Sequence, residues 1–252
     1  MKKEMSAIEC ANSQRYSTGE QVEEYLKEPY HRLRIEKSVQ MLKSYLQKNF
    51  KDVDIKDRTI LEIAGSTGMI SAYLKNQGYD VILTDIGEDA LKKAINNYPT
   101  LKTMYMDASN PFPFPNDSFH AIYAGEIIEH LFDTKLFFSE CARCLKDNGV
   151  LIITTPNLAT LQDRIKFLLG KSPRQIDPTH NYLYLHIRPF TVSKLKEISS
   201  FYNFANFKVT TNMVLWRLKN KKIVIPLIGK VAPSLGGTII LGCCKKAVDN
   251  SI

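Results

Sequence analysis

A glycine-rich segment is the first feature of the sequence that points to chemistry. Residues 64–68, with the sequence AGSTG, follow an apolar run and precede a segment with helical spacing. Such a turn lets backbone amides and a helix N-terminus approach a ligand closely. Asp85 ends the next apolar run, where an acid can accept hydrogen bonds from both hydroxyls of a ribose. The pattern predicts a nucleoside-containing ligand at the carboxyl ends of two neighbouring strands.

A second candidate site is the short segment EIIEH. If a helical turn starts at Glu126, then Glu129 and His130 follow at positions i+3 and i+4 and converge on one side. A divalent metal held there would bind two substrate oxygens and lower the pKa of a hydroxyl. His130 and the later His186 are also candidate general bases. In the competing interpretation no metal binds, Glu126 shapes a pocket, and His130 packs or caps a helix.

The elements that must position these residues alternate along the chain. Apolar runs of strand length are separated by segments with helical spacing, which predicts a mostly parallel sheet with right-handed crossovers. The fold class is therefore α/β, a Rossmann-like doubly wound sheet with helices on both faces. The predicted strands are 59–64, 80–85, 101–107, 119–126 and 150–155, and the predicted helices are 69–77, 88–97 and 131–147.

The remaining segments are predicted to flank this core in one domain. Helical spacing over 20–48, interrupted at Pro29, indicates a helical N-terminal cap. Residues 207–216 and 237–245 have the pattern of two closing strands, and the apolar stretch 223–244 is either a packed edge strand or a dimer contact. The expected division is 1–55 for the cap, 56–157 for the core, 158–205 for a lid and substrate region, and 206–246 for the closing strands.

Composition limits the function classes. The chain of 252 residues is 44% hydrophobic and 24% charged, as expected for a globular protein. The net charge of +8 favours anionic partners, such as nucleic acid, a phosphorylated substrate or an anionic membrane face. The lysines and arginines lie in short, scattered groups, so a solvated basic surface is the competing interpretation.

The spacing of the cysteines and the length of the apolar segments indicate the cellular compartment of the protein. The five cysteines show no disulfide framework, and Cys141 and Cys144 have the spacing of packing residues on one helical face. These features predict a reducing, cytoplasmic location. The first residues lack the apolar core of a signal peptide, and no apolar run approaches the roughly 20 residues of a membrane span.

Four segments together resemble a known family. The motifs ILEIAGSTG, VILTDI, MDASNPFPFPNDSFHAIYAGEIIEHL and NGVLIITTPN look like the successive motifs of class I S-adenosylmethionine-dependent methyltransferases. They are most similar to the small-molecule branch that includes the ubiquinone-biosynthesis O-methyltransferases. The resemblance covers about residues 30–210, and motifs in this order and spacing are more specific than any single glycine turn.

The resemblance implies that S-adenosylmethionine is the cofactor. The implied binding residues lie at the carboxyl ends of the strands and on the N-terminal helix: Arg34, Ala64, Gly65, Ser66, Gly68, Asp85, Ile86, Asp107, Ala108 and Ala124. The glycine turn lies against the methionine part, and Arg34 is spaced like an arginine that contacts the cofactor carboxylate. Asp85 binds the ribose, Ile86 packs near the adenine, and Asp107 accepts a hydrogen bond from its amino group.

The sequence departs from the family pattern at the turn. Ala64 and Ser66 stand where glycine is usual, and a serine Cβ crowds the ligand if its φ is positive. Gly65 stands at a position often held by cysteine and is expected to relieve this crowding. His120 replaces the usual aspartate before the fourth strand.

The resemblance also extends to the EIIEH segment. The same pattern binds a divalent metal in ubiquinone-pathway relatives and in small-RNA terminal 2′-O-methyltransferases, which add a later histidine. His186, in HIRPFT, resembles that fourth ligand. The implied metal set is Glu126, Glu129, His130 and His186. The other two histidines, His31 and His180, are expected at the surface.

The expected function is transfer of a methyl group to a hydroxyl of a small-molecule, sugar or glycan acceptor. Glu126, His130 and His186 are the candidate catalytic residues, and Thr155 and Asn157 are placed at the rim of the site. Basic and aromatic residues interleaved in 158–190 suit an anionic or sugar-bearing acceptor. Two alternatives remain: an RNA 2′-O-methyltransferase, and a non-catalytic protein that binds S-adenosylmethionine.

Overall fold

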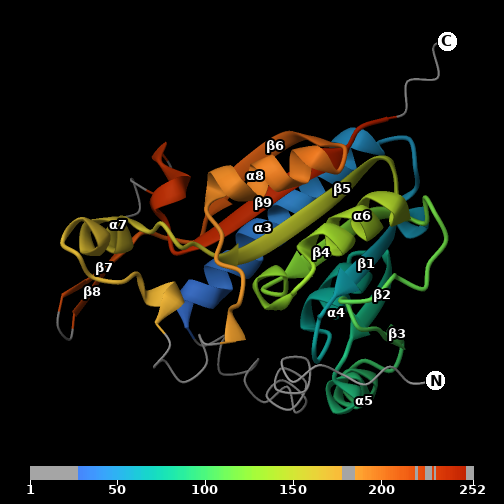
Figure 1. The fold of residues 1–252 in the computed structure, drawn as a ribbon. Coiled ribbons are helices and arrows are strands. Elements are labelled where there is room, and N and C mark those ends of the chain that lie inside the picture. Colours follow the sequence, from blue (N-terminus) through green and yellow to red (C-terminus); the bar gives the residue numbers. More distant parts are fainter. Residues whose placement is uncertain (1–27, 178–184, 219–220, 225–228, 230, 248–252) are drawn as a thin grey trace, which may run out of the picture.

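The computed structural model describes residues 28–177, 185–218, 221–224, 229 and 231–247. Its main sheet has seven strands: β1 Thr59–Ile63, β2 Asp80–Asp85, β3 Lys102–Tyr105, β4 Phe119–Gly125, β5 Leu145–Pro156, β6 Phe204–Thr211 and β9 Thr238–Lys245. They lie in the order β3-β2-β1-β4-β5-β9-β6 (Figure 1). The neighbours from β3 to β5 are parallel, and β9 is antiparallel to both β5 and β6. The predicted doubly wound, mostly parallel sheet is confirmed.

Helices cover both faces of this sheet. They are α3 Pro29–Asn49, α4 Met69–Asn76, α5 Glu88–Asn97, α6 Thr134–Cys144, α7 Leu161–Leu168 and α8 Val192–Phe201. Alternate strand residues face opposite sides, so Ile60 packs with Leu42 of α3, whereas Leu61 packs in the other core with Phe138 of α6. Figure 1 shows α6 and α8 in front of the sheet and α3 behind it. None of the helices in the described part of the chain has the length and apolarity that a bilayer span requires.

The N-terminal helix begins where the sequence predicts a boundary. Pro29 occupies the first turn of α3, where its missing amide hydrogen breaks no helical hydrogen bond. The helix runs across β5 and β9 and buries Leu42, Tyr45 and Leu46. The part of the predicted cap before residue 28 lies outside the described residues.

The prediction that the helix after β4 extends to residue 147 is wrong. The helix α6 ends at Cys144, and β5 begins at the next residue. Leu145 is fully buried and is paired with Phe119 of β4, so its backbone is extended. Asn148, where the helix was expected to end, has a φ of 60°. This left-handed residue lies within β5 instead.

The closing strands also differ from the prediction. A single strand over 207–216 is wrong, because β6 ends at Thr211 and a hairpin of β7 Leu215–Leu218 and β8 Lys221–Val224 follows. Asn212 ends β6: its Oδ1 accepts hydrogen bonds from the amides of Met213 (2.7 Å) and Thr238 (3.1 Å). The strand β9 is an interior strand, hydrogen-bonded on both sides, so the interpretation of this stretch as an edge strand is wrong.

A buried carboxyl group lies in the core beneath the glycine turn. Glu62 of β1 is 2% exposed and accepts a short hydrogen bond from the Ser71 hydroxyl of α4. Burial raises the pKa of Glu62 to about 7, the hydrogen bond from Ser71 opposes this shift, and the charge of Asp85 adds to it. The core therefore favours the protonated carboxyl group.

We expect Glu62 to make the protein less stable as pH rises. Its folded-state pKa of about 7 lies above the ordinary 4.5, so its stabilising effect is complete below pH 4.5 and is lost as pH rises through 7. Relative to Glu62→Gln, the free energy of unfolding of the wild type should fall by on the order of 3 kcal/mol between pH 4.5 and 8. Urea unfolding across this range measures it. Glu197→Gln, at an exposed acid of α8, is the control, and parallel pH profiles for wild type and Glu62→Gln would contradict the expectation.

Candidate active site

The glycine turn connects β1 to α4 with an unusual backbone. Ala64 has a φ of 56°, Ser66 of 51° and Gly68 of 79°. Ser66 therefore has the positive φ at which its Cβ would crowd a ligand, and Ala64 shares this backbone conformation. Two non-glycine residues in the left-handed region indicate strain, which the surrounding structure must hold in place.

Close packing explains why the turn has glycine at position 65. A Cβ on Gly65 would lie 2.3 Å from Leu83 Cδ1 and 2.6 Å from Glu62 Cδ. The amide of Gly65 also donates to the carbonyl of Thr84 at 3.1 Å, which ties the turn to β2. Gly65 therefore allows the turn to pack closely against the core. It does not remove the positive φ angles of its neighbours Ala64 and Ser66.

Asp85, at the end of β2, fixes two loops at once. Its Oδ2 accepts a hydrogen bond from the amide of Ser66 (2.8 Å), and its Oδ1 accepts one from the amide of Gly87 (2.7 Å). The side chain is buried, and burial raises the pKa of Asp85 although these amides oppose the shift. The bond to Ser66 explains how the left-handed backbone at Ser66 is held. Ile86, the next residue, is half-buried.

The loop after β3 joins the same edge of the sheet. The amide of Met106 donates to the carbonyl of Asp85 at 3.0 Å, so Asp107 follows directly beside the second loop. Asp107 accepts hydrogen bonds from the Ser109 amide (2.8 Å) and from Asn110 Nδ2 (2.7 Å). Ala108 is buried in the core. The structure thus gives Asp107 a local role in shaping its own turn.

Arg34 connects α3 to the ends of β4 and β5. One terminal nitrogen donates to Thr154 Oγ1 at 3.0 Å, and the Thr154 hydroxyl donates to Glu126 Oε1 at 2.9 Å. The guanidinium lies 4.0 Å from Glu126 Oε1. Burial lowers the pKa of Arg34, but the charge of Glu126 and its neighbours outweighs this, so the pKa is raised. Within the described part of the chain, the buried Nε of Arg34 has no hydrogen-bond partner.

Glu126 does not begin a helical turn, which corrects the prediction. Its φ is 55°, and the helical turn, of the 3-10 type, spans only Ile128–His130. The amide of Glu126 donates to the carbonyl of Thr154 at 2.8 Å, which turns the chain back toward β5. The carboxylate therefore faces Arg34 and Thr154. Ala124, two residues earlier, is fully buried at the end of β4.

The structure brings together three of the four predicted metal ligands. One ligand atom from each of Glu129, His130 and His186 lies within 4.8 Å of the others. Glu126 is outside this group. Glu129 is buried and accepts a hydrogen bond from the Thr155 hydroxyl at 2.9 Å. Burial raises the pKa of Glu129, and the charge of Glu126 adds to the rise.

The two histidine rings are oriented by Leu185 and Gln175. His130 Nδ1 lies 3.2 Å from the carbonyl oxygen of Leu185, and His186 Nδ1 lies 3.3 Å from Gln175 Oε1. Both partners are acceptors, so each neutral ring carries its proton on Nδ1 and a lone pair on Nε2. The rings meet edge to face with centroids 4.8 Å apart. Burial lowers the pKa of His130 to about 4, which keeps the ring neutral at pH 7.

Sequence reasoning missed two residues of this arrangement. Thr154 links Arg34 to Glu126, and Gln175 orients His186. The TTPN motif at the end of β5 is a usable signal for Thr154, because consecutive hydroxyls end a buried strand. His31, expected at the surface, is half-buried, and burial lowers its pKa to about 4. His180 lies outside the described residues.

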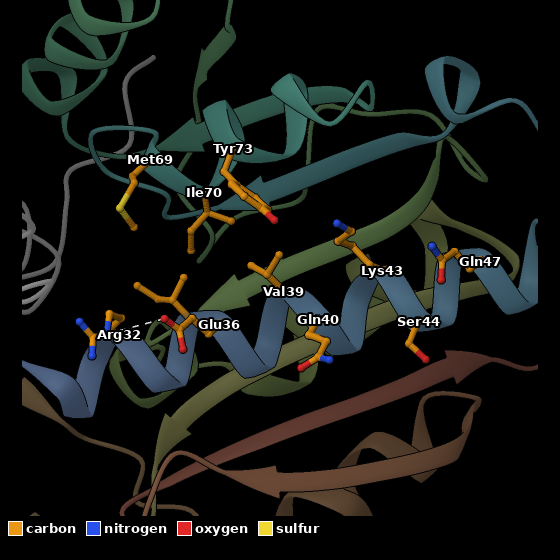
Figure 2. A pocket seen from close by; sticks show the side chains of 11 residues that line it. Arg32, Glu36, Val39, Gln40, Lys43, Ser44, Gln47, Met69, Ile70 and Tyr73 are labelled. Atoms are coloured by element: carbon orange, nitrogen blue, oxygen red, sulfur yellow. Dashed lines mark ion pairs between the residues drawn. The ribbon is translucent and has the colours of Figure 1, made fainter.

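A separate groove of about 630 Å³ lies between α3 and α4. Figure 2 shows Val39 and Lys43 of α3 facing Ile70 and Tyr73 of α4 across it. Lys43 lies over the Tyr73 ring, 5.8 Å from its centroid. None of the predicted site residues lines this groove, so it is distinct from the cluster at the strand ends.

Comparison with known proteins gives matches to methyltransferases over the central part of the chain. Residues 61–153 match a family described as a methyltransferase domain. A protein of Mycobacterium tuberculosis named as a probable S-adenosylmethionine-dependent methyltransferase is 31% identical over 123 residues, which cover 49% of this chain and 42% of that protein. The ubiquinone biosynthesis O-methyltransferase of Pelagibacter ubique is 30% identical over 142 residues, covering 52% of this chain and 57% of that protein. The matches thus span about half the length of these curated relatives.

Solved structures show the same fold. A methyltransferase from Archaeoglobus fulgidus superposes with a TM-score of 0.55 at 19% identity, over 82% of this chain and 94% of that one. Phosphoethanolamine N-methyltransferase 2 of Haemonchus contortus, solved with S-adenosylmethionine, gives a TM-score of 0.56 at 15% identity, over 82% of this chain and 53% of that one. At these identities the likeness establishes the fold.

We expect Arg34→Met to lower the free energy of unfolding by about 2 kcal/mol, because Thr154 loses a charged hydrogen-bond donor and Glu126 loses its ion-pair partner inside the protein. The matched control is Arg32→Met on the same helix, whose exposed ion pair with Glu36 should be worth less than about 0.5 kcal/mol. Chemical denaturation measures both. Equal losses in the two variants would show that the buried link contributes nothing specific.

Proposed function

We propose that this chain is a class I S-adenosylmethionine-dependent methyltransferase that transfers the methyl group to a hydroxyl of a small-molecule or glycan acceptor. The observation that carries this proposal is that the end of β5 contacts both the Arg34–Glu126 pair and the cluster of Glu129 with the two histidines. Thr154 and Thr155, adjacent on β5, bond Glu126 on the Arg34 side and Glu129 on the histidine side. A cofactor pocket and an acceptor pocket that share one strand end are what in-line transfer requires.

The residues at the strand ends fit S-adenosylmethionine. Asp85 is a buried carboxylate whose present donors are backbone amides, and its acceptor chemistry suits ribose hydroxyls. The buried Nε of Arg34 is a donor that suits the carboxylate of the cofactor. Gly68 at the start of α4 leaves the helix N-terminus accessible to a ligand. When bound, the cofactor supplies an electrophilic methyl group, and the protein supplies alignment.

The acceptor side is assigned to Glu129, His130 and His186. His130 and His186 each present Nε2 as the lone-pair nitrogen, and Glu129 adds a carboxylate. This donor set fits a divalent metal, which would lower the pKa of an acceptor hydroxyl. Without metal, the lone pair of His130 is the candidate acceptor of the hydroxyl proton, and its lowered pKa of about 4 makes it a weak base. Glu126, on the cofactor side of the same strand end, is assigned a positioning role.

Methylation of an RNA 2′-hydroxyl is the second candidate. The paired histidines with Glu129 and the net charge of +8 favour it. An acceptor screen that contains both phenolic or sugar hydroxyls and short RNAs separates the two. Strong salt dependence of acceptor binding would favour RNA, since phosphate contacts release counterions.

We also propose a reducing compartment such as the cytoplasm. Cys141, Cys144, Cys243 and Cys244 are buried and free, and burial raises the pKa of each thiol. Thiols of this kind act as packing residues and resist oxidation.

We expect calorimetric titration to show binding of S-adenosylmethionine by the wild type. Asp85→Ala should weaken it by about tenfold to a hundredfold, because hydrogen bonds to a charged group are lost and the Ser66 turn is released. Asp80→Ala, at the other end of β2 where Asp80 pairs with Lys102, is the matched control. No binding by a folded wild type would overturn the enzymatic proposal and favour a non-catalytic role linked to the strained Ser66.

We expect the histidine cluster to bind a divalent cation such as Co²⁺, read by its absorption spectrum. His186→Ala should abolish this binding, and Gln175→Ala should weaken it about tenfold, because second-shell partners orient ligand rings. His120→Asn, a change at a histidine outside the cluster, should leave it unchanged. Absence of a cobalt spectrum in the wild type would reject the metal site and leave the histidines as base candidates.

A further inference from the structure

Three consecutive large apolar side chains are exposed at the end of α7. Phe167 is 69% exposed, Leu168 84% and Leu169 69%. Ile165 and Ile176, before and after them, are 38% and 49% exposed. Large contiguous apolar patches of this kind mark binding surfaces in proteins that are otherwise well packed.

Cations frame this apolar tip. Arg164, Lys166, Lys171 and Arg174 flank the exposed residues, whereas the one acid of the segment, Asp163, is buried. The Asp163 carboxylate accepts hydrogen bonds from the Thr160 hydroxyl at 2.6 Å and the Arg174 amide at 3.2 Å, and it pairs with Lys166 Nζ at 3.7 Å, which leaves three more cations than acids in the segment 161–176. The outward charge of the segment is therefore positive.

The neighbouring hairpin continues the same composition. The helix α7 packs against β7, and Figure 1 shows both at the end of the molecule away from α5. Ile223 and Val224 of β8 are 48% and 47% exposed. The sequence of residues 215–224 contains four lysines and arginines and no acid.

We propose that the end of α7, together with Ile223 and Val224 of β8, docks on an anionic lipid surface. Apolar side chains framed by lysines match the two layers of a bilayer interface, where acyl chains take the apolar groups and anionic headgroups take the cations. A protein partner would require acids opposite these cations as well as an apolar hollow, whereas an anionic bilayer supplies both features at once. The long lysine side chains can extend from the apolar layer to the headgroups.

The location of the surface gives it a functional consequence. Gln175, which orients His186, is adjacent in the chain to the exposed Ile176. Docking would therefore place the acceptor side of the site next to the bilayer. The docking proposal itself does not depend on the identity of the acceptor or on catalysis.

The experiment is flotation of the full chain with phosphatidylcholine vesicles, with and without phosphatidylglycerol. We expect the wild type to float with vesicles that contain phosphatidylglycerol and to be released by high salt, and we expect weak flotation with phosphatidylcholine alone. The variant Phe167→Ser/Leu168→Ser/Leu169→Ser should lose at least about tenfold in vesicle affinity. The matched control is Phe201→Ser, which removes an aromatic side chain that is 77% exposed on α8, and it should bind like the wild type.

Two measurements show whether the triple variant loses vesicle binding because it is unfolded. Thermal unfolding and S-adenosylmethionine titration test whether the triple variant is folded, and the single change Leu168→Asp, at the most exposed position, serves if it is not. Flotation of the triple variant equal to that of the wild type would overturn the proposal, as would no flotation of the wild type with either vesicle. A wild-type dimer that these substitutions dissociate, without vesicle binding, would assign the surface to a second copy of the chain instead.

Discussion

The buried guanidinium of Arg34 is the interaction that unites the site. It comes from α3, which lies outside the parallel core, and it reaches the ends of two strands through Thr154 and Glu126. Two acids, Glu126 and Glu129, lie close together at this edge, and their mutual repulsion raises the free energy of the ionised pair. A nearby buried cation reduces this cost, so the position of α3 and the chemistry of the strand ends depend on each other.

The parts of the fold that depend on local pattern were predictable from sequence. Apolar runs bounded by turn residues located β1, β2 and β4, because strands covered on both faces must be continuously apolar. The parts that depend on distant partners were not predictable. Glu126 leaves the helical region because its amide pairs with Thr154, and β6 ends because Asn212 bonds to Thr238 of β9. No periodicity within a short window contains those contacts.

The candidate site also has residues that could be placed from the sequence and residues that could not. Asp85 could be placed by its position after a strand, and the structure adds why Ser66 tolerates a left-handed backbone beside it. His130 and His186 are far apart in the chain, and only the family resemblance suggested that they act together. In the structure the two rings meet edge to face, and Leu185 and Gln175 orient them. The helical turn expected from Glu126 is wrong, because the chain reverses at Glu126 and the turn spans only Ile128–His130.

The net charge of +8 is more informative when the exposure of the individual side chains is known. From sequence alone it fits a solvated lysine-rich surface as well as an anionic partner. In the structure, four cations of 161–176 lie beside three consecutive apolar side chains, and the one acid of the segment, Asp163, is buried and pairs with Lys166 alone among their side chains. A solvated surface needs no such apolar residues, and their exposure to water costs free energy unless something covers them. The same face borders Gln175, which orients His186, so whatever covers this face lies next to the histidine cluster.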